Sequence, residues 1–126
     1  MIKRILKISL LTTLVFACII PVQAKIKYHE KYYQDMWCIQ NDGIQEFKVK
    51  DESIRIDCQT EEYSLEVDFA KKFYEAIGQS LYYSILTGKK PAVLLILEKK
   101  SDELYLKRLN IVSDKYNIKV FTVKNY

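Results

Sequence analysis

The chain has 126 residues and carries 20 Lys and Arg against 16 Asp and Glu, so its formal net charge is +4. Three of the basic residues and none of the acidic ones lie in residues 1–24. The other 102 residues therefore carry 17 basic and 16 acidic residues, a net charge of +1. A charge this close to zero gives no evidence for general nucleic-acid binding. His29 is the only histidine, and no serine or cysteine nucleophile motif, zinc-ligand cluster or glycine-rich phosphate loop is present, which argues against those enzyme classes.

Residues 1–24 have the features of a secretory signal peptide. The basic start "MIKRILK" precedes an apolar run that ends in "VQA", which indicates cleavage after Ala24. The apolar run is too short for a comfortable membrane span, so we expect no stable transmembrane anchor after cleavage. An alternative is a lipoprotein cleavage box at "VFAC", which would anchor the chain at Cys18. The sequence therefore predicts an exported protein, periplasmic or secreted, with residues 25–126 as a single domain.

The first segment after the leader, "YHEKYYQDMWCIQNDG" at residues 28–43, predicts a helix that ends near Asn41. Its apolar residues have a helical distribution, and Asn41, Asp42 and Gly43 are suitable helix-terminating residues. The apolar residues of this helix are Tyr32, Tyr33, Met36, Trp37 and Ile39.

Cys38 in this helix and Cys58 are the two cysteines that remain after cleavage. In an oxidising compartment a disulfide between them can form and persist. Such a bridge would close a loop of about 20 residues and stabilise the fold by about 3 kcal/mol. The alternative is two buried free thiols.

Three short strands are expected next, at residues 44–49, 53–57 and 64–69. In each of them apolar and polar residues alternate with a period of two, and short polar segments separate them. This arrangement predicts an antiparallel meander.

From Ala70 the apolar period becomes helical, and the predicted helix ends at Gly88. Its buried stripe is expected to be Phe73, Ile77, Leu81 and Ile85, with Gly78 packed closely against the sheet. Residues 92–97, "AVLLIL", are apolar on both faces and predict a strand covered by helices on each side.

A second helix is expected to begin at Ser101, and residues 118–123 to form the last strand. The buried residues of that helix are expected to be Tyr105, Leu109, Val112 and Tyr116. The predicted fold class is α/β: a mixed sheet with an antiparallel meander and a right-handed βαβ crossover, with helices on both faces.

Acidic residues follow the pleat of two neighbouring strands. Asp57 lies on the polar face of its strand, and Glu66 and Asp68 lie opposite the apolar residues of the next strand. Glu46 on the first strand could join them. Carboxylates gathered in this way repel one another, and the hard cations Mg²⁺ or Mn²⁺ are suitable counter-charges. The alternative is a polar strand face that is simply solvated.

The following helix carries Lys72, Glu75, Gln79 and Tyr83 along one side, roughly opposite its apolar stripe. With "IRIDC", "LEVDF" and "GQSLYY", the chain resembles the PD-(D/E)XK nuclease superfamily, which includes restriction endonucleases, archaeal Holliday-junction resolvases and RecB-type exonucleases. Between Trp37 and Val123 it is also similar to a group of small exported bacterial proteins that share this fold.

The resemblance implies a restriction endonuclease-like fold in which Asp57 and Glu66 ligate a metal ion and Glu46 completes the ligand set. Gln79 and Tyr83 would then position the site or the nucleic-acid backbone. The superfamily normally has a lysine where this chain has Asp68, and this lysine stabilises charge on the phosphate.

Some superfamily members carry that lysine on the neighbouring helix. Lys72 is the best candidate for such a displaced catalytic lysine, with Lys71 second, and Asp68 would then be an extra metal ligand. The alternative is that both lysines are solvated residues at a helix start.

The resemblance thus implies a Mg²⁺-dependent nuclease that hydrolyses phosphodiester bonds of DNA or RNA outside the cytoplasm. The alternative is a catalytically inactive module of nuclease fold that binds a protein or an envelope component. The near-neutral charge of the mature chain slightly favours this alternative.

Overall fold

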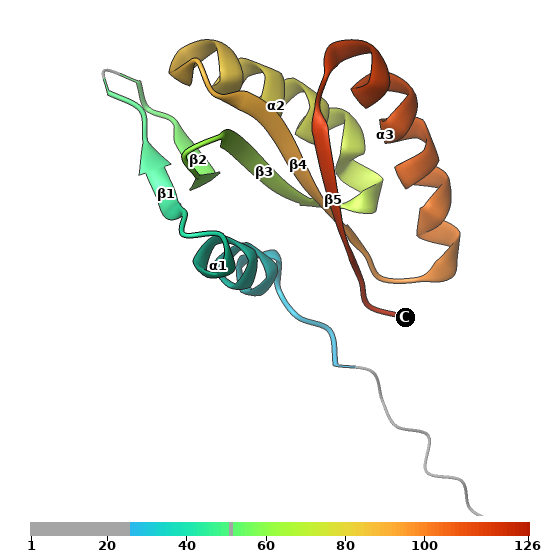
Figure 1. Ribbon diagram of the computed structural model, residues 1–126. Coiled ribbons are helices and arrows are strands. Elements are labelled where there is room, and N and C mark those ends of the chain that lie inside the picture. The colour runs from blue at the N-terminus through green and yellow to red at the C-terminus, as the bar shows by residue number, and fades with distance from the viewer. Residues whose placement is uncertain (1–25, 51) are drawn as a thin grey trace, which may run out of the picture.

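The computed structural model describes residues 26–50 and 52–126 (Figure 1). The elements follow the expected order: α1 (Glu30–Gln40), β1 (Ile44–Lys48), β2 (Arg55–Gln59), β3 (Tyr63–Phe69), α2 (Phe73–Thr87), β4 (Lys90–Leu97), α3 (Glu103–Tyr116) and β5 (Lys119–Lys124). Short 3₁₀ turns precede the last two helices, η1 (Ala70–Lys72) before α2 and η2 (Lys100–Asp102) before α3. The expected signal peptide and the lipoprotein alternative at Cys18 lie outside the described residues.

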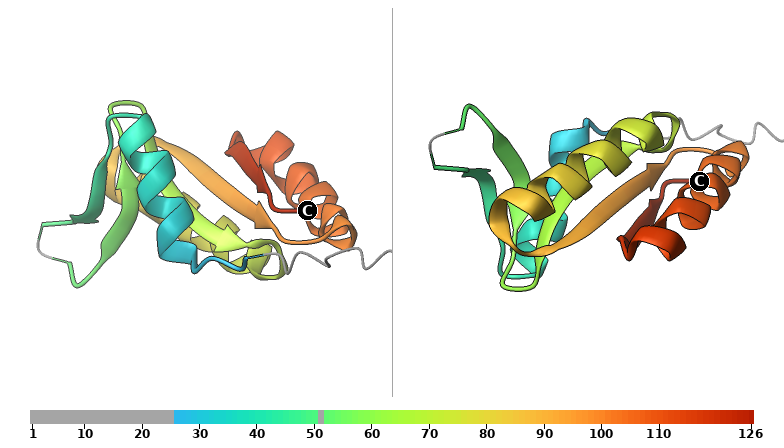
Figure 2. Two further views of the ribbon diagram at one scale, coloured as in Figure 1. Left: turned by 90° about the horizontal axis from the view of Figure 1, so that it is seen from below. Right: turned by 90° about the horizontal axis from the view of Figure 1, so that it is seen from above.

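The five strands form one mixed sheet in the order β1-β2-β3-β4-β5. β1, β2 and β3 pair antiparallel, whereas β3, β4 and β5 pair parallel, with α2 and α3 as the connections between the parallel strands. α1 covers one face of the sheet, and α2 and α3 cover the other (Figure 2). The predicted α/β class, antiparallel meander and strand–helix–strand crossover are confirmed.

β4 lies in the middle of both hydrophobic cores, as its uninterrupted apolar sequence predicts. Ala92, Leu94 and Ile96 pack on the α1 side, and the alternate residues Val93, Leu95 and Leu97 pack against α2 and α3. All six are completely buried. A strand that is covered on both faces has no polar side to present, which explains "AVLLIL".

The predicted helix stripes are wrong at their ends. Ile85 is 79% exposed and Tyr116 is also exposed. A four-residue step advances 400° around a helix, so each step drifts about 40° from the preceding side chain and Ile85 lies about 120° from Phe73. The residues of α2 that are buried are Phe73, Ala76, Ser80 and Tyr83.

The expected close packing of Gly78 against the sheet is also wrong, because no neighbouring heavy atom lies within 4 Å of the position that its Cβ would occupy. In α1, the apolar side chains of Met36 and Ile39 are exposed, whereas the polar side chain of Gln34 is buried. A polar side chain on the buried face of an otherwise amphipathic helix indicates a specific partner.

The Cys38–Cys58 disulfide is present and joins α1 to β2, with the two Cα atoms 5.7 Å apart. Gly43, in the turn between α1 and β1, lies against it: a Cβ at this position would be 2.3 Å from Sγ of Cys58 and 2.7 Å from Sγ of Cys38. Only glycine fits there without movement of the bridge. The disulfide indicates that the protein occupies an oxidising environment. Within the described parts of the chain, no helix is long and apolar enough to cross a membrane.

Candidate functional site

Three of the acidic residues expected at the site lie on the face of the sheet that α2 covers. Leu65 and Val67 point into the core beneath α1, so Glu66 and Asp68, which alternate with them, point to the opposite side. Asp57 precedes Cys58, which faces α1, and therefore points away from α1 as well. Glu66 and Asp68 are only 5% and 2% exposed, which is unusual for acidic side chains and indicates a specific environment.

Strand register brings Asp57 and Glu66 together. Cys58 pairs with Leu65 in the β2–β3 ladder, and the next residues along the antiparallel strands are Asp57 and Glu66. Oδ2 of Asp57 also accepts a hydrogen bond of 2.8 Å from the backbone N–H of Val67. Burial raises the pKa of the Asp57 carboxyl to about 6, against the opposing effect of this hydrogen bond, and the charge of Glu46 raises it further.

Glu66 is the most perturbed group of the cluster. Burial raises the pKa of its carboxyl to about 9, and the charges of Asp57 and Asp68 act in the same direction. The hydroxyl of Tyr83 acts in the opposite direction, because it is placed to donate to the carboxylate. Oε2 of Glu66 is buried and has no hydrogen-bond partner among the described residues. An acceptor left in this state is costly, so Glu66 needs a proton, a donor or a cation.

Asp68 lies near Glu30, in the first turn of α1, and near Lys72, just before α2. Burial raises the pKa of its carboxyl to about 7, and the nearby Glu30 also raises it, whereas Lys72 lowers it. Nζ of Lys72 lies 3.6 Å from Oδ1 of Asp68, and the lysine side chain is 54% exposed. Glu30, whose own pKa is raised chiefly by burial, was not expected at the site. It comes from the first turn of α1, far from the strands in sequence.

Tyr83 and Gln79 lie one helical turn apart on α2, with Nε2 of Gln79 3.1 Å from the hydroxyl of Tyr83. The sequence pattern placed both residues opposite the apolar stripe, but Tyr83 is buried. Burial and the charge of Glu66 raise the pKa of its hydroxyl to about 12, so it remains protonated and available as a donor. Gln79 therefore orients the hydroxyl of Tyr83, which faces the buried carboxyl group of Glu66.

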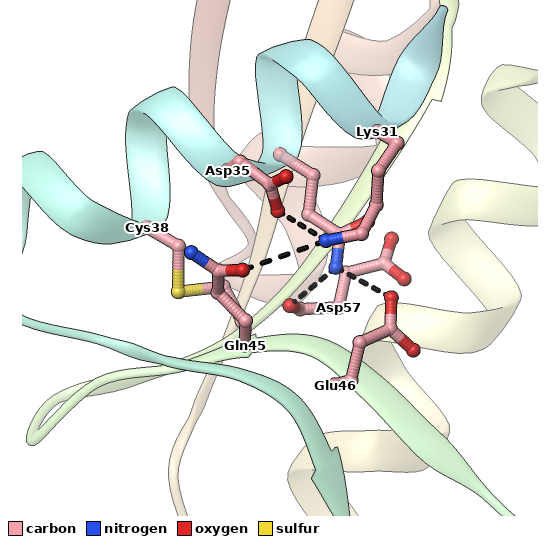
Figure 3. Close-up of polar contacts among 8 residues, drawn as sticks. Lys31, Asp35, Cys38, Gln45, Glu46 and Asp57 are labelled. Carbon is pink, nitrogen blue, oxygen red and sulfur yellow. Dashed lines mark hydrogen bonds and ion pairs between the residues drawn. A yellow bond between two sulfur atoms is a disulfide. The ribbon is translucent and has the colours of Figure 1, made fainter.

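Glu46 is held by a side chain that sequence analysis did not identify. The amide of the buried Gln34 donates hydrogen bonds of 2.8 Å to Oε1 of Glu46 and to the backbone carbonyl of Asp57. In Figure 3 these two bonds are the dashed lines that end on Glu46 and on Asp57. Glu46 has a φ of 50°, which is rare for a residue with a side chain and costs about 1–3 kcal/mol. Strain of this kind persists only where the surroundings impose it.

The cluster as a whole does not converge on one point. Within residues 26–50 and 52–126, no three Asp, Glu, His or Cys side chains are grouped so that they could hold a metal ion together. The expected ligands Glu46, Asp57, Glu66 and Asp68 are therefore not all brought together around one ion. Mg²⁺ is usually held by only one or two carboxylates together with waters and phosphates, so the adjacent pair Asp57 and Glu66, with its unpartnered Oε2, fits such an ion chemically.

Comparisons with protein-family models, curated proteins and solved structures find no match to this chain.

Proposed function

We propose that the protein is an exported nuclease of restriction endonuclease-like fold that hydrolyses phosphodiester bonds with the aid of Mg²⁺ or Mn²⁺. The observation that supports this proposal best is the buried Glu66 carboxyl, which lies beside Asp57 with one oxygen unpartnered. Burying several carboxyl groups together lowers stability, and perturbed acids of this kind concentrate at functional sites. The disulfide is consistent with a site of action outside the cytoplasm.

Asp57 and Glu66 would hold the cation together with waters, and Glu46 and Asp68 would remain outer carboxylates that do not ligate it directly. When bound, a divalent ion polarises the scissile phosphate and lowers the pKa of its water. Tyr83 would donate to Glu66 and keep that carboxyl oriented, while Gln79 fixes the tyrosine hydroxyl. Gln34 would hold Glu46 next to Asp57.

Lys72 would supply the positive charge that the superfamily lysine normally provides. Its ammonium group is tethered beside the cluster by Asp68 yet remains exposed, so a phosphate could reach it. Asp68, which replaces the usual lysine, would then serve as the anchor of Lys72 as well as an outer carboxylate.

A second candidate function, a catalytically inactive module that binds a protein or an envelope component, is favoured by the outer surface of α2. Tyr74 and Ile85 are 72% and 79% exposed, and Tyr82 lies between them in sequence. Exposed apolar side chains on one helix suit a protein partner.

The decisive experiment measures Mn²⁺ binding by calorimetry and cleavage of plasmid DNA and labelled RNA by the purified, oxidised protein. Asp57→Asn and Glu66→Gln should each abolish cation binding and reduce cleavage by at least about 100-fold. Asp114→Asn on α3 is the matched control, since Asp114 is exposed and far from the cluster in sequence. Cleavage that survives both cluster substitutions would refute the proposal. Tight cation binding without cleavage would instead favour the inactive module.

A further inference from the structure

A separate cavity of about 290 Å³ lies at the carboxyl ends of β3 and β4. Phe69, the last residue of β3, and Glu98, which directly follows β4, both line it. Because β3 and β4 are parallel, their carboxyl ends meet at the same edge of the sheet. Side chains that follow these strands can therefore surround one ligand there.

Three lysines from three different segments surround this cavity: Lys27 ahead of α1, Lys71 in η1, and Lys99 after β4. All three are exposed, and none forms an ion pair with any residue that the structure describes. Three ammonium groups that share one cavity without being held in ion pairs favour a bound anion. Lysine is a common phosphate ligand.

Two acidic residues also line the cavity, but one of them is engaged by the backbone. Oδ2 of Asp102 accepts hydrogen bonds from the backbone N–H groups of Glu98 at 3.0 Å and Lys99 at 3.3 Å. Asp102 is only 4% exposed, so its carboxylate holds the loop while the lysines face solvent. Its Oδ1 is buried without a hydrogen-bond partner among the described residues. Glu98 is therefore the one acidic side chain that a bound anion would meet directly.

The cavity adjoins the carboxylate cluster through two short chain segments. Lys71 is followed by Lys72, whose Nζ lies 3.6 Å from Oδ1 of Asp68. Lys27, which also lines the cavity, is three residues ahead of Glu30, which interacts with Asp68. A chain of phosphates that placed one group at the cluster would thus bring another to the lysines.

We propose that this cavity is a phosphate subsite, in which Lys27, Lys71 and Lys99 bind a phosphodiester of a nucleic-acid strand next to the one presented to the carboxylates. This inference rests on the proposed nuclease function. It gives a nearly neutral protein a local cationic surface where one is needed, since phosphate contacts by Lys and Arg provide most of the affinity for nucleic acids.

The test measures binding of a fluorescein-labelled oligodeoxythymidine and its RNA counterpart by anisotropy, with EDTA present, over a series of salt concentrations. The combined Lys27→Gln, Lys71→Gln and Lys99→Gln variant should bind at least about tenfold more weakly at low salt. Its plot of log affinity against log salt should also be less steep by about 2, at roughly 0.7 per lost phosphate contact. The control combines Lys48→Gln, Lys107→Gln and Lys115→Gln, which removes three exposed lysines elsewhere and should change neither quantity.

Glu98→Gln provides a test of the opposite sign, because removing this negative charge should tighten oligonucleotide binding. Unchanged affinity and salt dependence in the triple cavity variant would overturn the inference. So would competition by inorganic phosphate that is equal for the wild type and that variant. No cleavage is measured in EDTA, so the two proposals fail separately. If the triple cavity variant binds the oligonucleotide more weakly but the wild type shows no Mn²⁺-dependent cleavage, only the nuclease proposal is refuted. If the wild type cleaves but the triple cavity variant binds as tightly as the wild type, only the phosphate subsite is refuted.

Discussion

Glu66 should make the cation-free protein less stable as the pH rises. The pKa of its carboxyl is about 9 in the folded state and has the ordinary value of 4.5 when unfolded. Between these two values the folded protein retains a proton that the unfolded chain has released, so the free energy of unfolding falls with increasing pH. The contribution of Glu66 to stability is therefore fully present below pH 4.5 and is lost as the pH rises to the folded-state pKa of about 9.

The size of the loss of stability follows from the one proton that the folded state retains on Glu66 and from the three pH units between pH 5 and pH 8. Each pH unit across this window changes the free energy of unfolding by about 1.4 kcal/mol, so raising the pH from 5 to 8 should remove about 4 kcal/mol. For a domain of this size, that loss lowers the melting temperature by at least about 10 °C. Asp57 and Asp68, whose pKa values are raised to about 6 and about 7, act in the same direction.

Thermal unfolding followed by circular dichroism at pH 5, 6, 7 and 8 in EDTA checks this prediction. Glu66→Gln should remove most of the pH dependence, whereas Glu61→Gln, at an exposed carboxyl in the β2–β3 turn, should retain it. Excess Mg²⁺ should raise the melting temperature more at pH 8 than at pH 5, because the cation competes with the proton for the same oxygens. A wild-type stability that is flat or rises across this range, or a Glu66→Gln variant with an unchanged slope, would refute the reasoning.

Three further substitutions, two of them with a control substitution, test the supports of the site. Gly43→Ala should prevent the disulfide from closing, which a free-thiol assay on the oxidised protein detects. The control is Gly78→Ala, which has open space around it and should stabilise α2 by up to about 1 kcal/mol in denaturant titrations. Gln34→Leu should cost about 1–3 kcal/mol of unfolding free energy and weaken Mn²⁺ binding measured by calorimetry, since two buried acceptors lose their shared donor. Tyr83→Phe should lower the cleavage rate without changing oligonucleotide affinity in EDTA. The control Tyr82→Phe, at an exposed tyrosine, should alter neither quantity. An equal loss of cleavage in both variants would argue against a role for the buried hydroxyl of Tyr83.

Much of the sheet could be predicted because strand alternation is a local property. The period of two in residues 64–69 assigns Glu66 and Asp68 to one face whatever the rest of the chain does. The contact between Asp57 and Glu66 needs in addition the antiparallel register, which the short β2–β3 turn fixes. The orientation of α2 was predicted less well, because the four-residue steps that suggested a stripe through Ile85 drift around the helix.

The contribution of α1 could not be predicted from periodicity, because it depends on how a helix docks on strands more than 20 residues away. Gln34 and the carbonyl of Asp57 that it binds are 23 residues apart. The two cysteines nevertheless carried a usable signal. Glu30, Gln34 and Cys38 follow one another at four-residue steps and so lie along one side of α1, and the disulfide directs that side toward β2 next to Asp57. A bridge inferred from two cysteines thus implies that the polar residues one and two turns earlier in the helix face the acidic strands. The covalent link that stabilises the fold is therefore also what brings Gln34 and Glu30 to the carboxylates.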